Sequence, residues 1–297
     1  MIEKICYGGW PNCIRIFDED IELIATTDVG PRVIRYGFIG GQNMFKEFAE
    51  QMGGTGEESW KPRGGHRIWV APEVVPDTYA LDNAPVRAIV RENGVELTQP
   101  VEAETELEKS IDVQLLSNGV TVTHRIRNAG SKSRTLAPWA LSMMAPGGAG
   151  ITKFPPRGAH PENLPPTNPL IMWAFTDLSD PRWTFTEKYL ILRQDAARRA
   201  PQKLGHFNKK TMGAYLLGSD LFVKRYDADP SKAYADFGAS YETFVNGDFL
   251  ELETLGPLEE VAAGAAVEHV ERWSLHRNIR IGEWSDEELD RVLPVVS

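Results

Sequence analysis

Twelve residues decide the fold of this chain: TFVNGDFLELET, residues 243–254. The Asn246-Gly247 pair is a strong signal for a β-hairpin, because Asn and Gly tolerate the positive φ angles that a tight turn requires. After the turn, leucines and glutamates alternate with the period of two that is typical of a strand whose two faces differ. The leucines of the LELE run therefore face a core, whereas Glu251 and Glu253 share the opposite face.

The same hairpin brings a third carboxylate alongside these two. If Asn246-Gly247 is a two-residue turn, Glu242 lies directly across from Glu251, on the face that also carries Glu253. Three carboxylates on one sheet face cannot be buried without partners, because an unpaired buried charge is strongly unfavourable. The face is therefore either a solvated outer surface or a polar binding face on which one carboxylate acts as a base.

Hairpin and strand signals recur along the whole chain. Further Asn-Gly pairs stand at positions 93–94 and 118–119. Period-two patterns predict strands at 21–27, 33–38, 86–91, 95–98, 111–116, 120–127, 134–143, 189–193, 213–217, 221–225 and 267–275. Helix signals are few: a capping box, Ser285 with Glu288, predicts a short helix over 285–293, and residues 46–52 could form another short turn of helix.

These patterns predict an all-β protein. A proline-rich stretch, residues 155–169, interrupts the strands and is expected to be a long ordered loop or a linker. Because the strands before and after it have the same character, we expect one domain over 1–297, a sandwich of two large antiparallel sheets, with a flattened barrel as the nearest alternative. No repeat with a period of 20 to 50 residues supports a propeller.

Composition narrows the function classes. The chain has 297 residues and a formal net charge of -10, which argues against a nucleic-acid partner. Its two cysteines, Cys6 and Cys13, form no disulfide framework, and no His/Cys/Asp cluster has metal-ligand spacing. No stretch has the length of a signal peptide's apolar run or of a membrane span. We therefore expect a cytoplasmic monomer or homodimer with no metal, no cofactor and no membrane partner.

A second segment carries candidate chemistry: RGGHRIW, residues 63–69. Its two glycines let the backbone approach a ligand closely. His66 is either a structural residue or an acid–base group, and Trp69 offers a stacking surface. Arg63 and Arg67 either hold an anionic substituent or pair with the protein's own carboxylates.

Three other basic residues are weaker candidates for the binding site. His124 lies in a predicted strand and could face either side of a sheet. His206 and Lys209 belong to a polar segment, residues 205–210, that could reach a binding site. No nucleophile motif accompanies any of the histidines.

Three motifs resemble the galactose mutarotase-like superfamily, which contains the aldose 1-epimerases and their hexose-6-phosphate relatives. LET at 252–254 is similar to the epimerase motif whose glutamate is the general base, which is Glu253 here. KPRGG at 61–65 is similar to the segment of the hexose-phosphate branch whose arginine, here Arg63, holds the substrate. DVGPRVIR at 28–35, followed by GGQNMF at 40–45, resembles the opening of the superfamily's sheet scaffold, and the likeness to a bacterial branch covers most of the chain.

The resemblance implies a β-supersandwich and a carbohydrate substrate. Most relatives carry a second histidine that protonates the ring oxygen, but the corresponding segment here, LAPWALSMM at 136–144, has none. If this protein is such an enzyme, His66, His124 or His206 must supply the acid.

The resulting hypothesis is a mutarotase that acts on a sugar or an anionic sugar derivative. Glu253 would remove the anomeric proton, while His66, in the same cleft, protonates the ring oxygen. Arg63 and Arg67 would position the sugar, and Trp69 or Trp139 would stack on it. Two alternatives remain open: a lyase or hydrolase that pairs Glu242 or Glu251 with Glu253, and a sugar-binding protein without catalysis.

Overall fold

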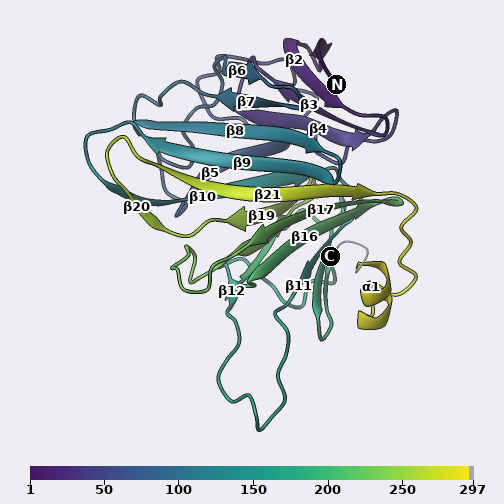
Figure 1. Ribbon diagram of the computed structural model, residues 1–297. Helices are drawn as coiled ribbons and strands as arrows, with labels where there is room; N and C mark the ends of the chain where they lie inside the picture. The colour runs from purple at the N-terminus through teal and green to yellow at the C-terminus, as the bar shows by residue number, and fades with distance from the viewer. Residues whose placement is uncertain (294–297) are drawn as a thin grey trace.

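The computed structural model describes residues 1–293 and consists of two antiparallel sheets that lie face to face (Figure 1). The final four residues of the predicted domain lie outside the described part. Strand makes up 47% of the chain and helix 2%, which confirms the all-β sandwich. Both sheets are open, with free edge strands, so the flattened barrel is wrong.

The first sheet has 11 strands. Its order is β1 (Ile2–Tyr7), β2 (Trp10–Phe17), β3 (Ile21–Thr26), β4 (Arg32–Phe38), β5 (Gly65–Ala71), β10 (Arg134–Met144), β19 (Leu250–Leu255), β18 (Tyr241–Val245), β15 (Gln202–His206) and β12 (Leu170–Met172), and β20 (Glu259–Val261) pairs with β10.

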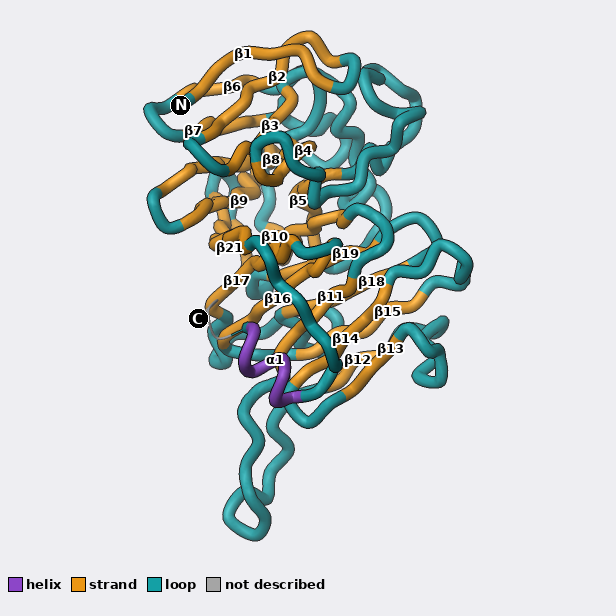
Figure 2. Tube along the Cα trace, turned by 90° about the vertical axis from the view of Figure 1, so that its right-hand side faces the viewer, coloured by secondary structure: helices purple, strands orange, loops and turns teal. Residues whose placement is uncertain are grey.

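The second sheet has 10 strands, and Figure 2 shows how the two sheets stack. Its order is β13 (Trp183–Phe185), β14 (Tyr189–Arg193), β11 (Ala149–Lys153), β16 (Lys210–Leu217), β17 (Asp220–Asp227), β21 (Ala266–His276), β9 (Gly119–Asn128), β8 (Leu107–Leu116), β7 (Gly94–Thr98) and β6 (Arg87–Val90).

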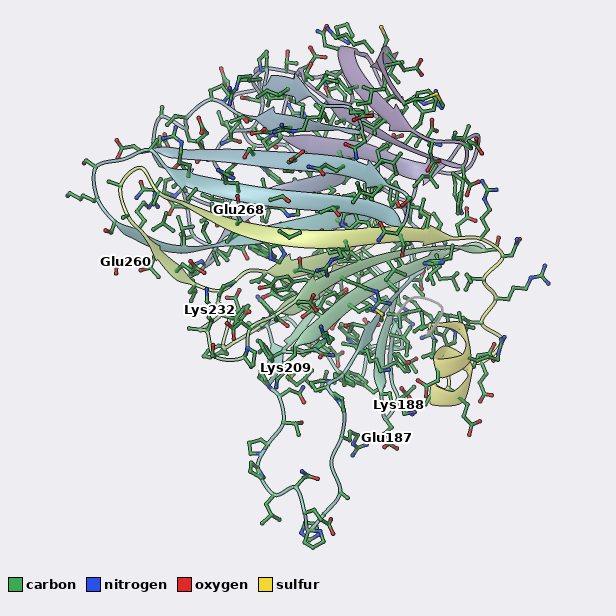
Figure 3. All side chains as sticks on the ribbon, in the orientation of Figure 1. Glu187, Lys188, Lys209, Lys232, Glu260 and Glu268 are labelled. Atoms are coloured by element: carbon green, nitrogen blue, oxygen red, sulfur yellow. The ribbon has the colours of Figure 1, made fainter. Side chains whose placement is uncertain are left out.

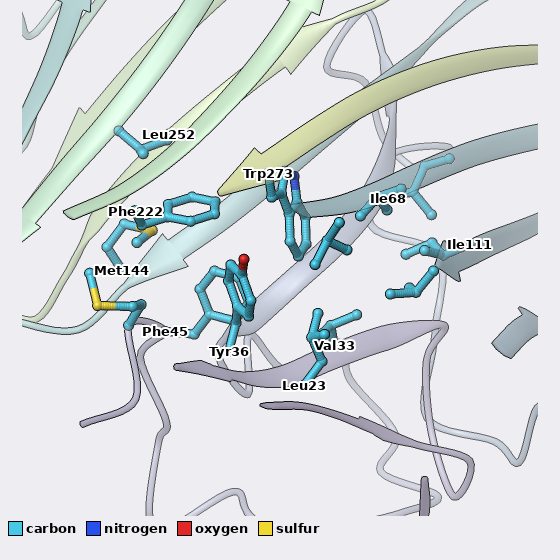
Figure 4. Packing of buried hydrophobic residues seen from close by; sticks show 14 of the residues in the cluster. Leu23, Val33, Tyr36, Phe45, Ile68, Ile111, Met144, Phe222, Leu252 and Trp273 are labelled. Atoms are coloured by element: carbon cyan, nitrogen blue, oxygen red, sulfur yellow. The ribbon is translucent and has the colours of Figure 1, made fainter. Parts of the chain in front are cut away.

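The main core lies between the two sheets. Aromatic rings from both sheets meet there edge to face: Tyr36 of β4 lies 5.7 Å from Phe222 of β17 between ring centroids, and Phe222 lies 5.6 Å from Trp273 of β21 (Figure 4). Leu250 and Leu252 belong to the same core, as the LELE alternation predicts. Burying each such side chain contributes about 1.5–3 kcal/mol, so this layer fixes which face of each strand points inward.

The hairpin of residues 243–254 is present, but its register differs from the prediction. Val245 pairs with Leu250, so the turn contains four residues, and Glu242 lies opposite Glu253 instead of Glu251. The Asn246 side chain causes this, because its Oδ1 accepts hydrogen bonds from the backbone N–H groups of Asp248 and Phe249. A shift of two positions preserves the faces, so the three carboxylates still share one.

The only helix in the described residues is α1 (Asp286–Val292). Its N-cap Ser285 accepts a hydrogen bond from the backbone N–H of Glu288. Residues 46–52 form turns and no helix; a single i to i−4 hydrogen bond, from Met52 N to Phe48 O, is present there. In the described part of the chain no helix has the length and apolarity needed to cross a membrane.

Residues 154–169 form the proline-rich loop between β11 and β12, which projects away from both sheets at the lower end of Figure 1. Leu164 in this loop is exposed.

Candidate active site

Six polar and aromatic side chains gather on the face of the 11-stranded sheet that points away from the other sheet. We call them the outer cluster: Arg67 on β5, Trp139 on β10, Lys203 on β15, Glu242 on β18, and Glu251 and Glu253 on β19. Strand pairing puts them on one face, since Arg67 and Glu253 are both register partners of Leu141, and Glu242 is a partner of Glu253.

Glu253 lies at the centre of the outer cluster. Its Oε2 accepts hydrogen bonds from Trp139 Nε1 and from Lys203 Nζ, each at 3.0 Å. The same Lys203 Nζ lies 2.7 Å from Glu242 Oε2. Glu242 and Glu253 are 0% exposed and Lys203 is 6% exposed, so one ammonium group serves two fully buried carboxylates.

Arg67 and Glu251 form a second ion pair beside this centre, with 3.0 Å between Nη2 and Oε1. An aromatic wall surrounds both cations. The guanidinium of Arg67 lies 4.4 Å from the ring centroid of Trp69, and Lys203 Nζ lies 4.7 Å from that of Trp139 and 4.6 Å from that of Trp173. Cations and aromatic faces attract each other, so the wall holds the cations in place.

Burial and charge set the protonation of the outer cluster. Burial acts to lower the pKa of Lys203, but the charges of Glu253 and Glu242 outweigh it and raise that pKa, so the ammonium stays charged. Burial raises the pKa of Glu242 well above its ordinary value, against the opposing effect of Lys203. Burial likewise raises the pKa of Glu251, although Arg67 opposes it.

Several buried atoms of the outer cluster have no hydrogen-bond partner among the described residues: Oε1 of Glu253, Oε1 of Glu242, and Nε and Nη1 of Arg67. Buried polar groups are usually satisfied, so these atoms call for a partner that the described residues do not supply, such as a bound ligand or water. The acceptors suit hydroxyl donors, and the guanidinium nitrogens suit an oxygen acceptor.

The prediction that His66 and Glu253 share one cleft is wrong. His66 precedes Arg67 on β5 and therefore points to the other face, into the core between the sheets. There its Nδ1 lies 2.9 Å from Ser142 Oγ, and its Nε2 lies 2.6 Å from His124 Nε2. His124 is equally buried, so neither histidine can reach a ligand held by the outer cluster.

His66 and His124 belong to a buried set that we call the inner network: His66, His124, Ser142, Lys224, Thr254, His269 and Glu271. Lys224 Nζ lies 2.7 Å from Glu271 Oε1 and donates to the backbone oxygens of Ala140 and Leu252. The other carboxylate oxygen, Oε2 of Glu271, accepts a hydrogen bond from Trp273 Nε1 at 2.8 Å. The inner network thus satisfies a buried ion pair and supports β10 and β19 from behind.

His66, His124 and Glu271 present three ligand atoms within 4.8 Å of one another, a spacing compatible with a metal. Their chemistry does not fit one. Two nitrogen ligands on a tetrahedral zinc ion would stand roughly 3.3 Å apart, whereas the 2.6 Å between the two Nε2 atoms is a hydrogen-bond distance. Lys224 already neutralises Glu271, so the inner network is a hydrogen-bonded structure.

The other predicted binding residues also lie away from the outer cluster or already have protein partners. His206 is buried in the core, with Nε2 3.0 Å from Thr152 Oγ1. Lys209 is exposed in the turn before β16 (Figure 3). The guanidinium of Arg63 is buried: Nη2 donates to Glu57 and Nη1 lies 3.8 Å from Asp82, while Nε and Nη1 have no hydrogen-bond partner among the described residues.

Sequence reasoning missed Lys203 and, within the inner network, Lys224 and Glu271. Nothing local marks Lys203, because its partners lie 39 and 50 positions away along the chain. For Glu271 a signal existed: Val267, His269, Glu271 and Trp273 alternate with charged or exposed residues in β21, which places this carboxylate on an apolar face.

The two-sheet arrangement is the fold of galactose mutarotase-like proteins. A galactose mutarotase-like protein from Lactobacillus casei matches with a TM-score of 0.56 and 13% identity over 89% of this chain and 100% of that one. A galactose mutarotase related enzyme from Lactobacillus acidophilus matches with a TM-score of 0.58 and 8% identity over 90% and 98%. The resemblance in fold is therefore confirmed. No protein-family model and no curated protein sequence matches this chain.

Proposed function

We propose that this protein is a carbohydrate-active enzyme that interconverts the anomers of a small sugar, with Glu253 as the general base. The observation that carries the proposal is the setting of Glu253: Oε2 is held by Trp139 and Lys203, while Oε1 is buried without a partner among the described residues. An oriented carboxylate with one free oxygen is suited to accept a proton from a bound hydroxyl group.

The surrounding side chains support a sugar as the ligand. Carbohydrates present hydroxyl groups to polar atoms and C–H faces to aromatic rings, and the outer cluster combines both kinds of partner. Trp69 is 9% exposed and Glu251 is 7% exposed, whereas Glu242 and Glu253 have no exposure. A ligand would therefore approach over Trp69 and Glu251. The deep burial of the central carboxylates favours a monosaccharide over a polymer, and so favours a mutarotase over a polysaccharide lyase or hydrolase.

The charges favour an uncharged sugar. The outer cluster holds three carboxylates and only two cations. Arg63, the candidate for holding a phosphate, already pairs with Glu57, and Arg32 beside it pairs with Asp82 at 2.6 Å. A phosphorylated sugar would have to displace these internal pairs, so the proposal is limited to neutral aldoses and related neutral derivatives.

Anomeric exchange measured by NMR tests the proposal. Purified protein is added to neutral aldoses and to their 6-phosphates, and magnetisation transfer between α and β anomers is recorded. Enhanced exchange on at least one neutral aldose, and none by Glu253→Gln, is expected. If saturation-transfer NMR detects binding of an aldose but anomeric exchange is not enhanced, the protein is instead a non-catalytic sugar-binding protein.

A further inference from the structure

We infer that Glu242 is the proton donor to the ring oxygen of the sugar, and that Lys203 holds Glu242 and Glu253 as a pair that carries one proton. The inference rests on the proposed anomer interconversion and supplies the acid that this reaction needs. The resemblance to the aldose 1-epimerases implies a histidine in this role, and the inference assigns the role to a carboxyl group.

The first support is geometric. Glu242 and Glu253 are direct register partners on β18 and β19, and both reach the Nζ of Lys203, at 2.7 Å and 3.0 Å. Direct partners on antiparallel strands have side chains about 4.5–5.5 Å apart at Cβ. Each of the two carboxyl groups also has an Oε1 atom without a partner among the described residues. A sugar that offers its O1 hydroxyl to one group therefore lies within reach of the other.

The second support is the charge of the outer cluster. With Lys203 and Arg67 charged, three ionised carboxylates would leave one uncompensated negative charge in a site where every member is at least nine-tenths buried. Such a charge is strongly disfavoured, and a carboxyl group in this position takes up a proton instead. One added proton makes the set neutral.

Hydrogen bonding decides which carboxyl group carries that proton. Glu253 accepts from both Trp139 and Lys203, whereas Glu242 has Lys203 as its single cationic contact. The nearby charges of Glu253 and Asp236 further disfavour ionisation of Glu242, whose pKa burial raises. The ionised member is therefore Glu253 and the protonated member Glu242, which is the division of roles that acid and base catalysis requires.

The position of the histidines removes the alternative. All six histidines lie in the described part of the chain. His66, His124, His206 and His269 are buried with partners in the core between the sheets. Of the other two, His160 lies in the projecting loop and His276 ends β21 on the 10-stranded sheet. None belongs to the outer face of the 11-stranded sheet.

The proton transfers balance. Glu253 takes the proton from the O1 hydroxyl, a C1=O1 double bond forms, the C1–O5 bond breaks, and O5 takes the proton of Glu242. After rotation about C1–C2, O5 attacks the other face of C1 and returns its proton to Glu242. O1 then recovers its proton from Glu253. Both carboxyl groups end in their starting states, and no other reactant is needed.

Two measurements on Glu242→Gln, Glu253→Gln and the wild-type protein test the inference. Glu22→Gln is the matched control, because Glu22 is a buried carboxylate of the same sheet that pairs with Arg15 and Arg35, away from the outer cluster. The first measurement is anomeric exchange at several pH values. The second is infrared difference spectroscopy of the carboxyl C=O stretching band, which separates a protonated carboxyl group from a carboxylate without reference to activity.

The inference predicts a loss of exchange of about 10²–10⁴-fold in Glu242→Gln and in Glu253→Gln, and no loss in Glu22→Gln. It also predicts a protonated-carboxyl band in the wild type near neutral pH that Glu242→Gln removes and Glu22→Gln leaves in place. Glutamine resembles a protonated glutamate, so Glu242→Gln should fold; a large loss of thermal stability would mean that Glu242 is normally ionised and would overturn the inference.

Two other outcomes separate this inference from the proposed function. If the wild type catalyses exchange, Glu253→Gln is inactive and Glu242→Gln is fully active, the acid is another group while the proposed function stands. If the wild type accelerates exchange of no aldose, the proposed function fails and the donor role of Glu242 fails with it, even if the infrared band confirms its proton.

Discussion

His66 and Glu253 lie on opposite faces of the same sheet, His66 directed into the core from β5 and Glu253 directed outward from β19. The thickness of a β-sheet thus separates two residues that would have to lie side by side to act on one sugar. The two clusters therefore have different roles: the outer cluster has the atoms that can contact a ligand, and the inner network stabilises the strands that carry the outer cluster.

Glu253→Gln should abolish anomeric exchange, a fall of about 10²–10⁴-fold, because the amide keeps the size of the side chain and cannot accept the sugar's proton. Sugar binding, followed by saturation-transfer NMR, should persist. If Glu253→Gln loses much of its thermal stability but exchanges the anomers at the wild-type rate, Glu253 has a structural role as the partner of Lys203.

Trp139→Phe tests whether the indole N–H positions Glu253. The ring is retained while the 3.0 Å hydrogen bond to Oε2 is lost. A hydrogen bond to a charged group contributes about 1.5–3 kcal/mol, so kcat should fall by about ten-fold or more. Trp69→Phe is the control, since its indole has no hydrogen-bond partner among the described residues; it should change KM and leave kcat nearly unchanged.

Lys203→Met should destabilise the fold, because it leaves two buried carboxyl groups without their cation. Removing one partner from a buried ion pair typically costs about 3–5 kcal/mol. The loss, measured by urea unfolding, should shrink as pH falls toward the ordinary range of glutamate, since protonated carboxyl groups need no cation. The exposed Lys209, replaced in the same way, should change stability by no more than about 0.5 kcal/mol. Equal effects of the two substitutions would contradict the buried cluster.

Acid should destabilise the protein through its buried histidines. Burial lowers the pKa of His269 to about 3 and that of His206 to about 4, and also lowers the pKa of His66 and His124. These groups bind protons only on unfolding, so their contribution is complete above pH about 6.5 and is lost as pH falls through the folded values. Burial raises the pKa values of Glu242 and Glu251, so these two carboxyl groups stabilise the folded protein as pH falls. The four buried histidines outnumber them.

The net slope should reach about 1.4 kcal/mol per pH unit for each excess proton bound by the unfolded chain. Urea unfolding at pH 7, 6.5, 6 and 5.5 measures it above the range in which Glu271, whose pKa is lowered in the folded protein, also contributes. His206→Asn should make the slope shallower. Stability that is constant or rises on acidification over this range would show that the histidines are charged or exposed in the folded protein.

Lys224 and Glu271 should behave as one unit. Lys224→Met leaves the buried Glu271 carboxylate unpaired and should lower the free energy of unfolding by about 3–5 kcal/mol. Glu271→Gln should have a similar effect, because it leaves the Lys224 ammonium without its carboxylate. The double variant removes both charges, so its loss should be smaller than the sum of the two single losses by at least about 1 kcal/mol. Additive losses in urea unfolding would mean that the pair is not coupled.

The two-sheet architecture and the shared face of Glu242, Glu251 and Glu253 follow from the residue pattern alone. Side-chain alternation is a local property of a strand, and a register shift of two positions at the Asn246 turn leaves it unchanged. The leucines of the LELE run also fixed which side of β19 faces the core, because the opposite side carries only charge.

The partners of that face, and the side of β5 to which His66 belongs, depend on how distant strands pack in the folded protein. Both faces of β5 mix polar and apolar residues and both are buried, so alternation in GHRIWVA cannot tell the inner side from the outer. That choice depends on pairing with β10, far away in the sequence, and on the second sheet behind it. Lys203 likewise reaches Glu253 only because β15, β18 and β19 are neighbours in the sheet, a property of the folded topology that no local pattern encodes.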